Sequence, residues 1–123
     1  MQESTKFKFS SIAVEGLKTQ AAEKESIVLN ELLNHKPVIE DLLVSYYYRS
    51  RGRIYNVRIN KPVLDANCNG AFKVNYNIGH FNACADVDSN EEESMHISIN
   101  ADLNSGSVLL TGEYFPEREP DEI

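Results

Sequence analysis

The stretch Leu42–Lys61, LLVSYYYRSRGRIYNVRINK, mixes apolar residues, tyrosines and arginines, and our interpretation of the fold starts from it. The Ser-Arg-Gly sequence at 50–52 predicts a three-residue turn that is closed by a glycine in the left-handed conformation. The segments on either side of this turn are then expected to pair as an antiparallel hairpin. The predicted pairs are Arg49 with Arg53, Tyr47 with Tyr55, Ser45 with Val57 and Leu43 with Ile59.

The side chains of this predicted hairpin alternate between two faces. The face expected to join the core carries Leu43, Tyr47, Tyr55, Val57 and Ile59. The face expected to meet water or a partner carries Tyr46, Tyr48, Asn56 and Arg58. Because a slip of one residue exchanges the two faces, the match between apolar positions supports this register.

The charge of the hairpin is opposite in sign to that of the whole chain. Between Tyr46 and Lys61 there is no acid, and there are five cations: Arg49, Arg51, Arg53, Arg58 and Lys61. The chain has a net charge of −7, so the remaining residues sum to −12. Directly opposed arginines destabilise a hairpin. We therefore expect an acidic segment of this protein, or an anionic partner, to neutralise them.

Length and composition narrow the class of protein. At 123 residues the chain is expected to form one domain, 1–123, that buries a core without the help of disulfides or metals. It has no apolar run long enough to cross a membrane, and no apolar segment typical of a secretory signal near its start. We expect a cytoplasmic protein in which Cys68 and Cys84 are reduced thiols, with a single disulfide as the alternative.

The N-terminal third predicts one strand and one long helix. Alternating apolar residues within 6–14 indicate a strand, with a bulge where the apolar phase shifts. Over 16–34, apolar residues recur at helical spacing opposite a charged face. Asn34 and then Pro37 are expected to end this helix. Residues 38–41 form a connector that can add a further helical turn.

Residues 62–94 predict a turn, a strand and a loop. Residues 62–70 are rich in turn formers. Residues 71–85 begin with a regular alternation of apolar and polar side chains, which indicates a half-buried strand that bends or bulges at Gly79. The acidic segment 86–94, DVDSNEEES, is predicted to be a polar loop.

The end of the chain predicts a second hairpin. Residues 95–103 and 107–115 alternate in the same way, and a two-residue turn at 105–106 is expected to join them. The predicted pairs are Leu103 with Val108, Ala101 with Leu110 and Ile97 with Tyr114. Residues 116–123, PEREPDEI, form a charged tail beyond this hairpin.

Together these elements predict an α+β domain in the order β-α-β-β-β-β-β. One long N-terminal amphipathic helix is expected to pack on a curled, mainly antiparallel sheet of five to six strands, which buries the apolar face of each. The order resembles helix-on-sheet folds such as the cystatin and hotdog architectures. The chain has neither the inhibitory motif of the first nor the catalytic signature of the second, so this resemblance implies no function.

Acidic residues are concentrated in the last third of the chain. Between Ala85 and Ile123, eleven acids accompany one base, which gives this third a net charge of −10. Such a surface steers basic proteins toward it and raises their association rate. Immunity proteins, antitoxins and phage-encoded inhibitors resemble this chain in size and charge. We therefore predict a non-enzymatic, inhibitor or immunity-type protein that docks on a basic, nucleic-acid-handling partner.

The predicted contact residues come from the acidic segment and from the hairpin. They are Asp86, Asp88, Glu91, Glu92 and Glu93, together with Tyr46, Tyr48, Arg49, Arg51, Arg53 and Arg58. Two other functions stay open. Interleaved tyrosines and arginines over 46–58 also suit base stacking and phosphate contacts, as in a nucleic-acid-binding module. A structural subunit of a larger assembly, such as a virion or secretion component, fits the same composition, and the oligomeric state is open.

Motifs for chemistry are missing from the sequence. His80 and Cys84 lie about 13 Å apart along a regular strand, too far for a base and its nucleophile unless a bulge intervenes. The glutamates at 91–93 lack the spacing of a calcium loop, and the two cysteines lack the close pairing of zinc ligands. Phosphate-binding loops and hydrolase signatures are absent. We expect no enzymatic activity, no cofactor and no metal.

Overall fold

The computed structural model describes residues 1–20, 23–47, 52–82 and 87–115, and for 80–82 and 87–89 it describes the backbone alone. The strands are β1 (Ser4–Lys8), β2 (Arg53–Ile59), β3 (Val63–Leu64), β4 (Gly70–Asn82), β5 (Val87–Asp102) and β6 (Ser107–Thr111). The helices are α1 (Ser11–Thr19), α2 (Lys24–Asn34) and α3 (Lys36–Tyr47).

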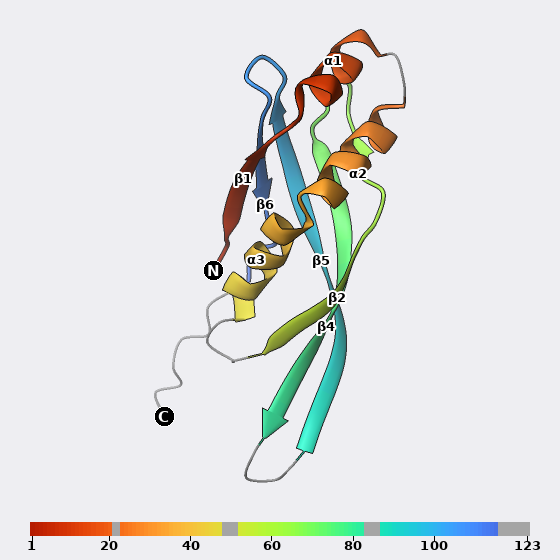
Figure 1. The fold of residues 1–123 in the computed structure, drawn as a ribbon. Coiled ribbons are helices and arrows are strands. Elements are labelled where there is room, and N and C mark those ends of the chain that lie inside the picture. The colour runs from red at the N-terminus through yellow and green to blue at the C-terminus, as the bar shows by residue number, and fades with distance from the viewer. Residues whose placement is uncertain (21–22, 48–51, 83–86, 116–123) are drawn as a thin grey trace.

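These elements form a curled six-stranded sheet with the three helices on one of its faces (Figure 1). The strand order is β1-β6-β5-β4-β2, and the short β3 pairs with β4. Every pairing among the described strands is antiparallel. The predicted α+β class and the curled antiparallel sheet are therefore confirmed.

The single helix expected over 16–34 is divided into α1 and α2. Gln20 ends α1 in a left-handed conformation (φ 53°), and its backbone N–H donates to the carbonyl of Gly16. A residue in this conformation ends an α-helix. The prediction of one long helix is wrong because the chain turns after Thr19, although apolar residues at helical spacing resume in α2.

α1 also begins earlier than predicted, inside the expected strand 6–14. The Ser10 side chain caps α1 by accepting a hydrogen bond from Ala13 N (3.2 Å). The backbone N–H of Ser10 donates to the buried carboxylate of Glu31 on α2 (2.7 Å). Ile12, which the alternation assigned to a strand, is 82% exposed on the helix. These capping contacts explain why a helix replaces the second half of the strand.

The N-terminal half of the predicted 42–61 hairpin is helical, so its pairing with β2 and its two-face register are wrong. This half forms the end of α3. The buried residues of α3 are Ile39, Leu42, Leu43 and Tyr46. Their spacing of three, four and seven residues is that of one helix face. Pro37 lies in the first turn of α3, where its missing N–H breaks no helical hydrogen bond.

β4 and β5 form one long hairpin whose register runs without a shift from Gly70↔Ile99 to Asn82↔Val87. The acidic segment from Val87 to Ser94 is part of β5, so its prediction as a loop is wrong. Glutamate is a poor strand former by itself. Here the segment lies opposite β4, which supplies its backbone partners. Gly79 causes no shift in the register.

The turn between β5 and β6 is longer than predicted. Ala101 pairs with Val108 and Ile99 pairs with Leu110, so residues 103–106 form the turn. The register differs by two residues from the prediction. A shift of two leaves each side chain on its own face, and the expected apolar face is retained. The predicted tail 116–123 lies outside the described residues.

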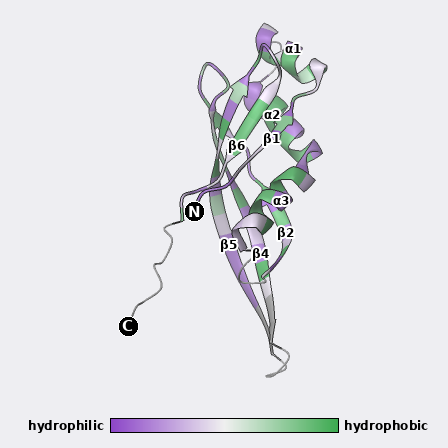
Figure 2. Ribbon diagram, turned by 90° about the vertical axis from the view of Figure 1, so that its left-hand side faces the viewer, coloured by the Kyte–Doolittle hydropathy of each residue, from purple (hydrophilic) through white to green (hydrophobic). Residues whose placement is uncertain are grey.

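The core lies between the helices and the sheet, and Figure 2 shows apolar residues gathered along this interface. Its largest fully buried side chains are Tyr76, Leu32, Ile39, Leu43, Met95, Ile97, Ile99 and Leu110. The other face of the sheet is mainly polar and carries none of the described helices. The distal end of the β4–β5 hairpin extends past the helices (Figure 1). This extension is part of the candidate site.

Candidate functional site

We call residues 76–82 of β4 and 87–94 of β5 the arm; Tyr76 at its base still contacts Tyr47 of α3, and its distal end extends past the helices (Figure 1). β2 pairs with β4 along one edge of the arm. On the other edge, β6 pairs with β5 only over 98–102. Within the described part of the chain, the arm is thus covered by a neighbouring strand on one edge only.

Side chains on the helix-facing side of β5 change from apolar to acidic where the arm begins. Ile97 and Met95 are fully buried. Glu93 and Glu91, the next two residues on the same side, are exposed. Glu92 lies on the opposite face, with 63% of its side chain exposed. The strand alternation continues unbroken, so the arm presents carboxylates on both of its faces.

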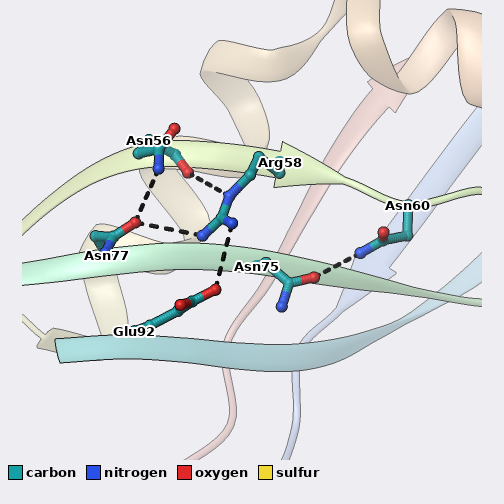
Figure 3. Close-up of polar contacts among 6 residues, drawn as sticks. All are labelled: Asn56, Arg58, Asn60, Asn75, Asn77 and Glu92. Atoms are coloured by element: carbon teal, nitrogen blue, oxygen red, sulfur yellow. Dashed lines mark hydrogen bonds and ion pairs between the residues drawn. The ribbon is translucent and has the colours of Figure 1, made fainter.

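The outer face of the arm holds a polar network centred on Arg58 (Figure 3). Arg58, on β2, reaches across β4 and makes an ion pair with Glu92 on β5 (Nη1–Oε1, 3.3 Å). Its guanidinium also donates to Asn77 Oδ1 (3.3 Å) and to the carbonyl of Asn56 (3.2 Å). Asn77 Oδ1 accepts a further bond from Asn56 Nδ2 (3.0 Å). These contacts fix Arg58 in place over the arm.

A β-bulge in β2 directs Arg58 toward this network. The register of β2 against β4 shifts between Tyr55 and Arg58, and Asn56 adopts φ 55° at the shift. Asparagine tolerates this left-handed conformation better than most residues. The Tyr55 hydroxyl donates to Asn90 Oδ1 (2.6 Å), which connects β2 to β5 at a second position.

Sequence reasoning missed this asparagine network. It placed Asn75 and Asn77 on the wet face of a strand, which is where they lie, but did not connect them to the arginines. Asn75 Oδ1 accepts from Asn60 Nδ2 (2.7 Å) (Figure 3). The signal in the sequence was the recurrence of asparagine at every second position, while the bulge that brings the partners together left no signal.

Tyr46, which we expected at an exposed partner surface, is buried in α3. Its hydroxyl donates to the carbonyl of Glu113 (2.8 Å) and accepts from the backbone N–H of Glu3 (2.9 Å). Its ring contacts that of Phe115 at a centroid distance of 5.0 Å. Tyr46 therefore connects α3 to the two ends of the described chain, and the expectation that it faces a partner is wrong.

Tyr47 lies at the base of the arm. Its hydroxyl and that of Tyr76 on β4 are 2.6 Å apart. Burial, and then the hydrogen bond from Tyr47, raise the pKa of Tyr76, and burial also raises the pKa of Tyr47. This pair stays protonated at neutral pH and stabilises the contact between α3 and the sheet.

The remaining predicted contact residues divide into three groups. Arg53 is exposed on β2, where it pairs with Gly79 of β4. Asp88 belongs to β5, and its backbone alone is described. Tyr48, Arg49, Arg51 and Asp86 lie outside the described residues. Of these charged residues, the structure brings Arg58 and Glu92 into contact.

The two charge groups meet at one contact, Arg58–Glu92. The expectation that an acidic segment of this protein neutralises an arginine is met there. Glu91 and Glu93 lie on the other face of the arm, and no cation among the described residues forms an ion pair with either. Lys61 instead pairs with Glu23 before α2 (2.6 Å), which lowers the pKa of Glu23. Among the described residues, negative charge therefore remains on the helix-facing side of the arm.

Groups suited to chemistry do not gather in the described residues. No cluster of three histidine, cysteine or acidic side chains in them can hold a metal. Cys68 is a buried free thiol beside a cavity of about 340 Å³, and burial raises the pKa of that thiol. Neither the side chain of His80 nor Cys84 is described. No described helix is both long enough and apolar enough to span a membrane.

Comparisons with known proteins give no relative for this chain. No protein-family model matches it, and no curated protein or solved structure shows significant similarity to it. The function is therefore argued from the arm itself.

Proposed function

We propose that this chain is a binding protein that holds a basic partner protein through the acidic arm of its β4–β5 hairpin. The observation that carries this proposal is the change along β5 from buried Met95 to exposed Glu93 and Glu91 on one side of the strand. Carboxylates on a projecting hairpin, with no ion-pair partner among the described residues, attract cations over a long range and dock with little rearrangement.

The inhibitor role is the finer part of the proposal. A narrow projecting hairpin with acids on both faces can enter the positively charged groove of a nucleic-acid-handling enzyme and occupy the path of the phosphates. The cytoplasm, where such enzymes meet their substrates, is the expected location. The size of the chain and its net charge of −7 fit this role.

The nucleic-acid-binding alternative has lost part of its support. It relied on Tyr46 and the arginines lying on one exposed face of a hairpin, whereas Tyr46 is buried and Arg58 is paired with Glu92. The tyrosine available on β2 is Tyr55, which is 37% exposed and hydrogen bonded to Asn90. These residues favour a protein partner over stacked bases.

Affinity capture with two matched variants tests the proposal. Immobilised wild-type protein is compared with the arm variant Glu91→Gln/Glu92→Gln/Glu93→Gln and with the helix variant Glu15→Gln/Glu40→Gln/Asp41→Asn. Both variants lose three negative charges, so they differ only in where the charge is removed. We expect wild type and the helix variant to retain the same basic protein from a lysate, identified by mass spectrometry, and the arm variant to lose it.

Activity of the captured protein then tests the inhibitor role. If it is a nuclease or another nucleic-acid enzyme, adding the wild-type chain should suppress its turnover and adding the arm variant should not. Equal capture by both variants would contradict the proposal. Recovery of many copies of this chain, or of shell proteins, would favour the assembly alternative.

A further inference from the structure

The edge of β5 that faces away from β4 is open along the arm. β6 pairs with β5 over Ser98–Asp102, and this pairing ends at Ser98. Beyond it, Gly112 N donates to Glu3 O before β1 (3.0 Å), on the side of β6 away from β5. Among the described strands, none pairs with β5 on this side between Val87 and Ile97.

The direction of the backbone groups on this edge follows from two hydrogen bonds. The N–H of Ala101 points toward β4, because it donates to Asn69 Oδ1 next to that strand (2.8 Å). The N–H of His96 points away from β4, because it donates to Glu113 Oε2 (2.9 Å). Backbone groups alternate along a strand. The N–H and C=O groups of Ser94, Glu92 and Asn90 therefore point outward from the open edge.

Glu113 marks where the open edge begins. Its carboxylate takes the place of a strand partner at His96, two residues beyond the end of the β5–β6 pairing at Ser98. Beyond His96, no described residue supplies an acceptor for the outward N–H groups of Ser94, Glu92 and Asn90. The outward groups from Asn90 to Ser94 span about 13 Å, enough for a partner strand of four or five residues.

Of the sheet edges in the described chain, this one is the most suitable for a further strand. The free edge of β2 is interrupted by the bulge between Tyr55 and Arg58, and bulges disrupt strand addition. β1 has only five residues. The arm of β5, in contrast, keeps a regular register with β4 throughout.

We propose that a lysine- or arginine-rich segment of the partner protein binds the arm in extended form and adds to the open edge of β5 as an extra strand. This inference rests on the proposed function and names how the same site holds its partner. Backbone hydrogen bonds to the outward groups would provide affinity, and the carboxylates would select a basic segment.

In the register centred on the arm, charge disfavours a second copy of this chain as the occupant. Antiparallel pairing of two β5 edges about Glu92 places Glu92 opposite its copy and Glu91 opposite Glu93, and like charges directly opposite each other are destabilising. The tail 116–123, PEREPDEI, lies outside the described residues and has four acids and one base, so its charge does not favour a place beside these carboxylates. A basic strand from another protein has neither defect.

The distribution of the acids also predicts the pattern of the partner segment. Glu92 is already paired with Arg58 on the outer face. Glu91 and Glu93, which form no ion pair with any described residue, share the helix-facing side. Because side chains of an added strand alternate between the same two faces, its cations should recur at every second position.

A capped peptide of alternating lysine and threonine, KTKTKTKT, is the probe for this proposal. Its affinity for the wild-type protein is measured at low salt by fluorescence anisotropy, beside two controls. One control carries N-methyl groups on its two central residues, which blocks N–H donors on both edges and keeps the charge. The other is KKKKTTTT, which keeps the composition and loses the alternation. We expect each control to bind about tenfold more weakly.

Amide hydrogen exchange locates the bound strand. In the free protein, the outward amides of Asn90, Glu92 and Ser94 should exchange faster than the inward amides of Glu91 and Glu93. Saturating KTKTKTKT should slow the outward amides. Ser94→Pro, which removes one outward donor and leaves the β4 ladder intact, should weaken binding, with Ser94→Ala as its control.

Equal binding of the N-methylated peptide, or no binding of any peptide, would overturn strand addition. Unprotected outward amides in the saturated complex would overturn it as well. If circular dichroism shows that Ser94→Pro is unfolded, strand addition is still tested by comparing KTKTKTKT with and without its N-methyl groups. If the methylated peptide binds as tightly as KTKTKTKT, strand addition is wrong but the proposed function still stands. The proposed function is contradicted by a different result, namely equal capture of the partner by wild type and by the arm variant.

Discussion

The two halves of β5 have the same backbone conformation and serve different purposes. In the half from Met95 to Asp102, every second side chain is apolar and most of these are buried under the helices. In the half that belongs to the arm, the same side of the strand carries Glu93 and Glu91 in water. The comparison shows that one strand can stabilise the fold at one end and present charge at the other, because the helices cover only part of it.

Because of this difference, the exposed glutamates of the arm should be replaceable without loss of the fold. The free energy of folding comes mainly from burial in the helix-covered half, since each fully buried aliphatic side chain contributes about 1.5–3 kcal/mol. The exposed acids of the arm have no such contribution to lose. Substitutions on one side of a single strand should therefore divide into two classes, and four predictions test or refine that division.

The largest expected effect is in the covered half. Ile97→Ala should lower the free energy of unfolding by about 2–5 kcal/mol, because Ile97 is fully buried and its truncation leaves a cavity. Glu91→Ala, on the same side of the same strand, should change it by less than about 0.5 kcal/mol. Urea denaturation followed by circular dichroism measures both. Similar losses of unfolding free energy in the two variants would contradict the division into a stabilising half and an exposed half.

A smaller effect is expected where α3 holds the chain ends. Tyr46→Phe removes the hydroxyl that donates to the carbonyl of Glu113 and accepts from the N–H of Glu3. The loss should be about 1–3 kcal/mol, because partly buried backbone groups are left without that partner. Thermal unfolding measures it. A stability equal to that of wild type would mean that water replaces the hydroxyl without penalty.

The stability of the fold should depend on alkaline pH through Tyr76, which lies at the boundary between the two halves. Burial raises the pKa of Tyr76 above the value of about 10 that tyrosine has when unfolded. The folded state then holds its proton when the unfolded state has lost it. The stabilisation is complete below pH 10 and is lost as the pH rises toward the folded pKa.

Unfolding measured between pH 8 and pH 11 should therefore show stability falling above about pH 10. Tyr76→Phe should make that fall less steep, since phenylalanine does not titrate. The slope of stability against pH is the informative quantity, because the substitution also changes stability at neutral pH. An unchanged slope would contradict the assignment of the boundary to this tyrosine.

The smallest effect is expected on the outer face of the arm. Arg58→Gln removes the exposed ion pair with Glu92, whose side chains are 45% and 63% exposed. Exposed pairs contribute about 0–1 kcal/mol, so stability should barely change. Binding of KTKTKTKT should instead become stronger, because Glu92 gains an unneutralised charge. Weaker binding would show that Arg58 itself contacts the partner.

The sequence predicts those elements of the fold that have a clear local pattern of apolar and polar residues. The strand at 71–78 and the apolar face of 95–101 were predicted because alternation with a period of two is unambiguous. The turn length at 103–106 was wrong by two residues, yet both strands kept their faces because two is the period of the strand.

The wrong predictions concern segments whose apolar residues fit both the helical period and the strand period. Over 39–47, Ile39, Leu42, Leu43 and Tyr46 lie on one helical face, but the following tyrosines and arginines favoured a strand. The arm was missed because its glutamates form a strand only in the presence of β4. The contact between Arg58 and Glu92 depends on a bulge at Asn56, and no residue pattern predicted it.

One measurement tests the central claim most directly. The dissociation constant of the captured basic protein is determined by calorimetry for wild type, for Glu91→Gln/Glu93→Gln and for the helix variant Glu15→Gln/Asp41→Asn, with unfolding recorded for all three. We predict that the arm variant binds at least about tenfold more weakly, while all three chains unfold alike. Equal weakening by both variants, or a loss of stability that accompanies the weaker binding, would contradict the account.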